Sequence, residues 1–186
     1  LVVVDTEKYG PLEFEAVLHA TGRRANTEGL GLENTDIELR PNGTIVVDEF
    51  CQTAVENVFA VGDVNGGLQF TYVSLDDFRV VNGYLHGNKE YTTADRKNVP
   101  YSTFISPALS HVGLHKEEAE AAYPNVAVAS LPVANMPRGA VNQDPRGLFR
   151  VTVDKDTNLI LGATLFGKNS EEIINLIKMA IDNKIP

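Results

Sequence analysis

The sequence predicts a mixed fold, α+β and α/β, with two units: short strands and one long helix first, then an antiparallel sheet with helices. Two observations carry this prediction. Short β-branched runs bounded by Gly, Pro, Asn or Asp alternate with stretches whose apolar residues recur every three or four positions. The charged segment Asp95–Pro100 lies between the two halves and ends on a proline. We therefore expect domains of residues 1–97 and 98–186.

The first unit is expected to hold four short strands, at residues 1–4, 14–20, 44–48 and 57–61. Turns at residues 9–11 and 41–43, both of which contain Gly and Pro, interrupt them. A helix is expected at residues 71–85, because its apolar residues share one face when they are spaced by three or four; these are Leu75, Phe78, Val81 and Leu85. Gly87 is expected to end this helix.

The second unit is expected to begin with an extended segment at residues 102–105 and a charged helix at residues 116–122. Three β-rich runs follow, at residues 126–133, 148–154 and 159–166, and the last two are joined by the hairpin-like turn Asp154–Asn158. A final helix is predicted from Ser170, the expected N-cap, with two acidic residues in its first turn. Its apolar stripe should pack on the sheet and consists of Ile173, Ile177, Ala180 and Ile181.

Composition excludes several classes of function. The chain has 186 residues, 43% of them hydrophobic, and a formal net charge of -9 with 16 scattered basic residues, so nucleic acid is not an expected partner. Its apolar runs are too short to span a bilayer, and no membrane association is expected. The single cysteine, Cys51, fits a reducing compartment, and we expect a cytoplasmic protein. Because the chain opens on a strand-like run without Met, we expect a piece of a longer polypeptide.

The most specific segment runs from Thr53 to Asp63, with the letters TAVENVFAVGD. It reads as a β-strand that ends in a Gly-Asp turn. Glycine at the end of a strand lets the backbone come close to a ligand, and a carboxylate there can accept hydrogen bonds from a ribose or polyol hydroxyl. Alone, a Gly-Asp pair is equally compatible with a turn whose Asp caps the next helix.

This run resembles the second FAD fingerprint of the class I pyridine nucleotide-disulfide oxidoreductases, T-x-x-x-x-(V/I)-(F/Y)-A-x-G-D, at every fixed position. The resemblance implies that Asp63 binds the ribitol chain of FAD, with Gly62 beside it. The residues that follow also resemble the family's continuation. They imply that Thr71, with Gln69 and Phe70, lies against the pyrimidine edge of the flavin, at the N-terminus of a helix.

Upstream, residues 16–26 resemble the strand and Gly-Arg turn at which the family's NAD domain returns the chain to the FAD domain. This implies cofactor-site positions for Gly22 and Arg23. The family usually has Pro where Ala25 stands, which removes rigidity from the turn. A Gly-Arg pair alone is commonly a solvated turn, and its weight comes from the fingerprint downstream.

Residues 104–114 resemble the opening of the family's dimerisation domain, and the likeness continues through residues 159–163 and the helix from Ser170. Ser106 and Ala108 depart in part from the usual Thr-x-Pro-Glu pattern. The family includes dihydrolipoamide dehydrogenase, glutathione reductase and mercuric reductase. The sequences of three segments are most similar to the branch of reactive-chlorine-resistance and hypothiocyanous acid reductases; these segments are residues 70–77, 103–113 and 131–138.

The resemblance implies a parent flavoprotein that passes electrons from NAD(P)H through FAD to a redox-active cysteine pair. From there they pass to a disulfide or a small oxidant such as hypothiocyanous acid. It implies a homodimer formed through residues of about 98–186. The family's pyrophosphate glycines, C-x-x-x-x-C pair, NAD(P)H glycine motif and His-Glu pair have no match here. No catalytic residue is therefore assigned, and the chain alone is expected neither to hold FAD tightly nor to be active.

Two alternatives stay open: a non-catalytic dimerisation module, and an enzyme of the coenzyme A disulfide reductase or NADH oxidase type. A C-x-x-x-x-C pair upstream would speak against the module, whereas a single redox cysteine there would favour the second alternative.

Cys51 receives no role, because thiol-disulfide exchange of this kind needs a resolving partner. His111 and His115 are four residues apart, but Gly113 lies between them and no shared helical face is expected, so no metal site is predicted.

Overall fold

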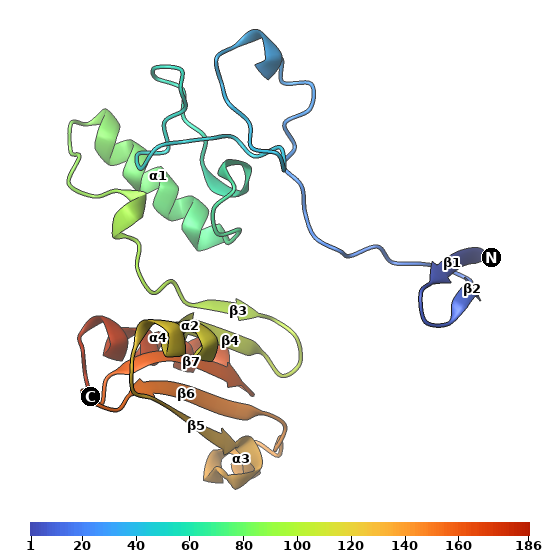
Figure 1. Cartoon of the computed structure of the whole chain (residues 1–186), viewed down its shortest axis with the longest axis vertical. Helices are drawn as coiled ribbons and strands as arrows, with labels where there is room; N and C mark the ends of the chain where they lie inside the picture. Colours follow the sequence, from blue (N-terminus) through green and yellow to red (C-terminus); the bar gives the residue numbers. More distant parts are fainter. The chain divides into compact units, whose positions relative to one another are not determined.

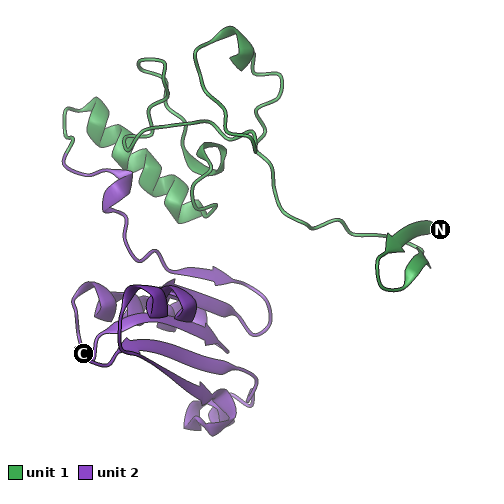
Figure 2. Cartoon of the chain, viewed as in Figure 1, with its two compact units in different colours: residues 1–89 green, residues 90–186 purple.

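The computed structural model describes residues 1–186 and divides into two compact units, Leu1–Lys89 and Glu90–Pro186 (Figure 2). The division lies between residues 89 and 90, whereas the sequence placed a domain boundary between residues 97 and 98. The difference arises because the segment 90–97 clusters with the second unit. The functional domain boundary at residue 97 stays a prediction.

The first unit contains a single two-stranded sheet, the antiparallel hairpin of β1 (Val2–Thr6) and β2 (Gly10–Phe14) (Figure 1). The strand expected at residues 14–20 is absent. The strands expected at 44–48 and 57–61 are reduced to two isolated bridges, Leu39–Ile45 and Gln52–Phe59. These expectations were wrong because β-branched residues favour a strand only where a neighbouring strand supplies ladder partners along its length.

The helix expected at residues 71–85 is confirmed as α1 (Thr71–Leu85), and its end is followed by Gly87 with φ +80°. Its buried residues are Val73, Asp77 and Val80. The apolar stripe noted in the sequence lies on another side of the helix, where Leu75, Phe78 and Leu85 are 52%, 57% and 59% exposed. None of the helices is both long and apolar enough to cross a membrane.

Short 3-10 helices punctuate the loops of the first unit, η1 (Leu32–Asn34) and η2 (Gly62–Asn65). Between them lies Cys51, whose side chain is fully buried and whose φ is +62°. Its backbone N–H donates to Asp48 (3.1 Å), and its carbonyl accepts from the N–H of Ala60 (3.0 Å). Cys51 therefore lies in a tight turn whose backbone is held on both sides.

The second unit is a five-stranded antiparallel sheet with the strand order β3-β4-β7-β6-β5 (Figure 1). Its strands are β3 (Tyr101–Thr103), β4 (Leu109–Gly113), β5 (Val126–Pro132), β6 (Leu148–Asp154) and β7 (Ile160–Phe166). The expected strands are confirmed to within two residues at each end. The other elements are η3 (Thr93–Asp95), α2 (Lys116–Ala122), η4 (Val133–Asn135), α3 (Pro137–Val141) and α4 (Ser170–Asp182).

The turn expected between β6 and β7 is confirmed, and Asp154 organises it. Its Oδ1 accepts the backbone N–H of Asp156 at 3.1 Å and its Oδ2 accepts the hydroxyl of Thr157 at 2.5 Å. Asn158 then takes φ +60°. The Asp154 side chain thus accepts hydrogen bonds from residues of its own turn. Such side-chain bonds are the reason that Asp favours turns, and the hairpin turn predicted from composition is observed.

The core of the second unit lies where α4 packs on β4 and β7, and its buried members are Val112, Ala163, Leu165 and Ile174. The stripe predicted on α4 packs against this cluster. Ser170 is not the N-cap. Asn169 precedes the helix, and the buried Ser170 hydroxyl donates instead to the carbonyl of Ala108 at 2.9 Å. Ser170 thus ties the start of α4 to the sheet rather than to its own first turn.

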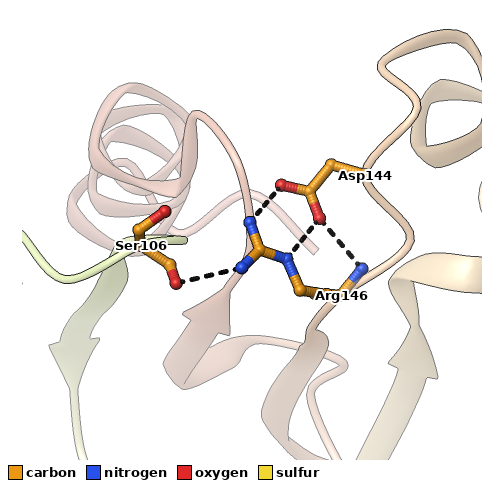
Figure 3. A network of polar contacts seen from close by, with 3 residues as sticks. All are labelled: Ser106, Asp144 and Arg146. Atoms are coloured by element: carbon orange, nitrogen blue, oxygen red, sulfur yellow. Dashed lines mark hydrogen bonds and ion pairs between the residues drawn. The ribbon is translucent and has the colours of Figure 1, made fainter.

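A forked ion pair holds the loop before β6 (Figure 3). Arg146 donates from Nε and Nη2 to the two carboxylate oxygens of Asp144, both at 2.8 Å, and from Nη1 to the carbonyl of Ser106 at 3.4 Å. The hydrogen bonds from Arg146 lower the pKa of the Asp144 carboxyl to about 2. The planar guanidinium makes this geometry specific, because both of its parallel donors meet one carboxylate.

Candidate functional site

Three of the residues singled out from the sequence meet in the first unit. Arg23 donates from Nη1 to Oδ2 of Asp63 at 2.8 Å and from Nη2 to the backbone carbonyl of Gln69 at 3.1 Å. Forty residues separate Arg23 from Asp63 in the chain. Their side chains are 61% and 46% exposed, so the pair is open to a ligand from solvent. Gly22, next to Arg23, is exposed and takes φ +118°.

The Gly-Asp turn depends on glycine at its first position. Gly62 opens η2 with φ +74°, a conformation that side chains rarely adopt. A Cβ built on Gly62 would lie 2.7 Å from the hydroxyl oxygen of Ser74 in α1. The turn can therefore come this close to α1 only because the residue is glycine. Asp63 follows Gly62 directly, within η2.

A polar network behind the turn involves residues that the sequence analysis missed. Asp77 of α1 accepts the backbone N–H of Gly62 at 2.8 Å and the side-chain amide of Asn65 at 2.9 Å. Arg40 donates from Nη1 to the carbonyls of Asn65 (2.7 Å) and Ile45 (3.0 Å). Asn65 and Asp77 are both buried. The turn is thus held by hydrogen bonds from α1 on one side and from Arg40 on the other.

One signal in the sequence could have found Asp77. It is spaced four residues after Val73 and three before Val80, which is the helical spacing of a buried face, and an aspartate on such a face requires hydrogen-bond partners. The apolar stripe on the other side of α1 drew the prediction instead. No comparable signal exists for Arg40, whose carbonyl partners are Ile45, five residues on, and Asn65, 25 residues on.

The helix α1 begins two residues after Gln69. Thr71 is the first helical residue, and the preceding Phe70 gives no side-chain cap. The rings of Phe70 and Tyr72 stack at a centroid distance of 5.4 Å and an angle of 4°. Burial raises the pKa of the Tyr72 hydroxyl. The N-terminal end of this fifteen-residue helix carries partial positive charge from the aligned peptide dipoles, which favours an electron-rich ligand.

An open hollow of about 440 Å³ adjoins this constellation. Among the expected site residues, Arg23, Gln69 and Phe70 line it, and the remaining lining residues are Arg24, Ala25, Asn42, Thr44, Gly66, Gly67 and Leu68. Gly66 takes φ +77°, and a Cβ there would lie 2.6 Å from the hydroxyl oxygen of Thr44.

This arrangement can bind a molecule with hydroxyls and negative charge. Arg23 contacts Oδ2 of Asp63, so Oδ1 remains as an acceptor for a ligand hydroxyl. The remaining guanidinium N–H groups of Arg23 and the helix end provide donors for anionic oxygens.

His111 and His115 come together in the second unit, although they share no helix. Their rings stack at 3.8 Å. His111 lies in β4, where Nε2 is 2.9 Å from the carbonyl of Gly113 and Nδ1 is 2.8 Å from the hydroxyl of Thr164. A carbonyl only accepts, so Nε2 carries the proton and Nδ1 accepts from Thr164. Burial lowers the pKa of His111, and both ring nitrogens are engaged within the chain.

Two family models match the chain. Residues 1–77 match the model described as pyridine nucleotide-disulphide oxidoreductase, and residues 99–186 match its dimerisation domain. The probable pyridine nucleotide-disulfide oxidoreductase RclA of Escherichia coli K12 is 45% identical over 96% of the chain and 41% of its own length. Glutathione reductase of Burkholderia cepacia is 35% identical over 91% of the chain and 38% of its own length.

The solved structure described as the HOCl-induced flavoprotein disulfide reductase RclA from Escherichia coli aligns with a TM-score of 0.92 and 44% identity. It covers 99% of this chain and 42% of the solved one. The chain therefore spans about two fifths of the length of these relatives. The two family models match residues 1–77 and 99–186, the RclA relative covers 96% of the chain, and the chain belongs to the pyridine nucleotide-disulphide oxidoreductase family.

Proposed function

We propose that the gene product that contains this chain is an FAD-dependent NAD(P)H:disulfide or small-oxidant oxidoreductase, and that this chain supplies part of its FAD site. One NAD(P)H and one proton would be consumed to give NAD(P)⁺ while a cysteine pair outside this chain is reduced from disulfide to two thiols. The substrate would then reoxidise the thiols: a disulfide would leave as two thiols, or hypothiocyanous acid as thiocyanate, water and a proton. FAD, when bound, supplies the relay of electrons between nicotinamide and disulfide.

The arrangement of Arg23, Asp63 and Gln69 around the start of α1 carries the proposal. Asp63 would accept ribitol hydroxyls through Oδ1, and Gly62 would let the backbone approach the cofactor. Arg23 would hold Asp63 in place while its remaining N–H groups donate to anionic oxygens of the cofactor. Gly22 lets the chain turn at Arg23, and Phe70 and Thr71 would lie beside the flavin ring, where the helix end favours electron density on its pyrimidine edge.

We further propose that the protein is a cytoplasmic homodimer formed through residues of about 98–186. The match of residues 99–186 to a dimerisation domain supports this pairing. The single cysteine supports a reducing compartment. Closed two-fold pairing is also the commonest arrangement among soluble oligomers.

The test is an FAD titration of two samples, the 186-residue chain and the gene product with its flanking sequence. Flavin fluorescence and the visible spectrum report binding. We expect the gene product to bind FAD and oxidise NAD(P)H, and the chain alone to bind weakly and be inactive. Asp63→Ala in the gene product should lower the affinity for FAD at least about tenfold, the loss of one charge-assisted hydrogen bond.

Glu56→Ala is the matched control, because Glu56 is an exposed acid in the same unit, away from the 62–71 segment in sequence. It should leave the affinity for FAD unchanged. A gene product that binds no FAD would refute the proposal and favour the non-catalytic module. Equal losses in Asp63→Ala and Glu56→Ala would show that net charge, not Asp63, matters.

A further inference from the structure

Asp77 is a buried acid that no step of the proposed electron transfer uses. Its side chain belongs to a residue that is 1% exposed, in the second turn of α1 between Val73 and Val80. A valine or leucine would fill this position at no polar cost, whereas a buried carboxylate is destabilising unless hydrogen bonds compensate it. The presence of an acid here therefore calls for an explanation beyond helix packing.

The hydrogen bonds of Asp77 converge on η2. Oδ2 accepts both the backbone N–H of Gly62 at 2.8 Å and the side-chain amide of Asn65 at 2.9 Å, which are the first and last residues of that 3-10 helix. One oxygen atom thus joins both ends of the turn. Asp63 follows Gly62 directly, so the backbone that carries Asp63 is fixed from α1.

Asn65 extends this connection. Its amide nitrogen also lies 3.3 Å from the carbonyl of Ala60, and its Oδ1 accepts the N–H of Gly67 at 3.0 Å. The single side chain of Asn65 therefore links the strand-like residues before the turn to the loop after it. Asp77 orients Asn65 because it occupies one of the two amide donors.

We infer that Asp77 is a positioning residue for the flavin site, which rests on the function proposed above. Asp77 does not touch the cofactor. It holds η2 so that Asp63 presents Oδ1 toward the ligand while Arg23 holds Oδ2. Without the carboxylate, Gly62 N–H and the Asn65 amide lose a buried acceptor, and the turn opens before α1 does.

The experiment has two measurements on three substitutions. Asp77→Ala removes the acceptor, Asp77→Asn keeps one acceptor oxygen, and Asp76→Ala is the matched control, since Asp76 is the neighbouring acid of the same helix and pairs with Arg79. The first measurement is the rate of amide hydrogen exchange at Gly62 in the 186-residue chain, by NMR. The second is the dissociation constant of FAD in the gene product, with the thermal midpoint recorded beside it.

We expect Asp77→Ala to speed exchange at Gly62 about tenfold and to weaken FAD binding by a similar factor, since one lost hydrogen bond corresponds to about that change. Asp77→Asn should restore most of both, and Asp76→Ala should alter neither. If Asp77→Ala does not fold, Asp77→Leu replaces it, because leucine fills the buried volume without an acceptor.

Unchanged exchange at Gly62 would overturn the inference directly. Faster exchange with unchanged FAD affinity would also overturn it, and would leave Asp77 a purely structural residue. A wild-type gene product that binds no FAD would instead refute the proposed function, and the exchange measurement would still decide whether Asp77 holds the turn.

Discussion

The two units of this chain are held together in different ways. The second unit closes a five-stranded sheet over an apolar cluster, with the stripe of α4 packed against it. The first unit has one hairpin and two isolated bridges, and its order around η2 depends on Arg40, Asn65 and Asp77. Large apolar residues of α1 stay exposed there. Packing stabilises the second unit, whereas directed hydrogen bonds shape the first.

This difference matches what each unit is proposed to do. Apolar burial is nondirectional and stabilises a scaffold regardless of small displacements. Hydrogen bonds depend on distance and angle, so they fix the position of a turn that presents Asp63 to a ligand. The unit that binds is therefore expected to be less stable than the unit that supports, as sites commonly are.

The sharpest test of this contrast is a pair of truncations. Leu165→Ala removes a side chain that is 1% exposed at the centre of the second unit, and should cost about 2–5 kcal/mol of unfolding free energy. Phe78→Ala truncates an exposed side chain of α1 and should cost less than about 0.5 kcal/mol. Urea unfolding followed by circular dichroism measures both. Similar costs would mean that the first unit also depends on apolar packing at that face.

Gly62→Ala tests how closely the turn must approach α1. The positive φ and the collision with Ser74 together should destabilise the first unit by about 1–3 kcal/mol. Gly87→Ala is the matched control, because Gly87 has φ +80° and an added Cβ there would meet nothing within 4 Å. Thermal unfolding should show the larger loss for Gly62→Ala. Equal losses would attribute the whole effect to backbone conformation.

Acidification should weaken the second unit through His111. Burial lowers its pKa in the folded state, so the unfolded chain takes up the proton first. Stability should fall as the pH drops below the ordinary histidine value of about 6.5, until the folded-state pKa is passed. His111→Gln should flatten this part of the profile of unfolding free energy against pH. A profile that keeps its slope in His111→Gln would assign the effect to other groups.

The smallest effect on stability is expected for Arg23→Ala. The Arg23–Asp63 pair is exposed, and exposed ion pairs contribute less than about 1 kcal/mol. Arg24→Ala, which breaks an exposed pair with Glu28, is the comparison. Differential scanning calorimetry should find both close to the unsubstituted chain. A clearly larger loss for Arg23→Ala would show that this residue supports the fold of the first unit as well as its ligand.

Much of the second unit could be predicted from the sequence, because local patterns of residues indicate its strands and helices. The strands at 148–154 and 159–166 alternate around a turn, and the spacing of the isoleucines in 173–181 marks the buried face of α4. The N-cap was misplaced by one residue, since Ser170 makes long-range bonds that no local pattern encodes.

The first unit was harder for the same physical reason. The runs at 14–20, 44–48 and 57–61 have strand composition, but a strand exists only if a partner lies alongside, and that depends on the rest of the fold. The motif singled out Gly62 and Asp63, and their role in a cofactor site stays a prediction. The helical spacing of Asp77 with Val73 and Val80 was overlooked, whereas Arg40 had no local signal, because its bond to the Asn65 carbonyl follows from tertiary structure.

Cys51, in its tight turn, is a natural probe of local opening. A thiol with no exposed surface reacts with a thiol-specific reagent only when its surroundings open, and the chain has no second cysteine to compete for that reagent. The rate of modification of Cys51 therefore measures opening around this turn of the first unit, without any engineered label.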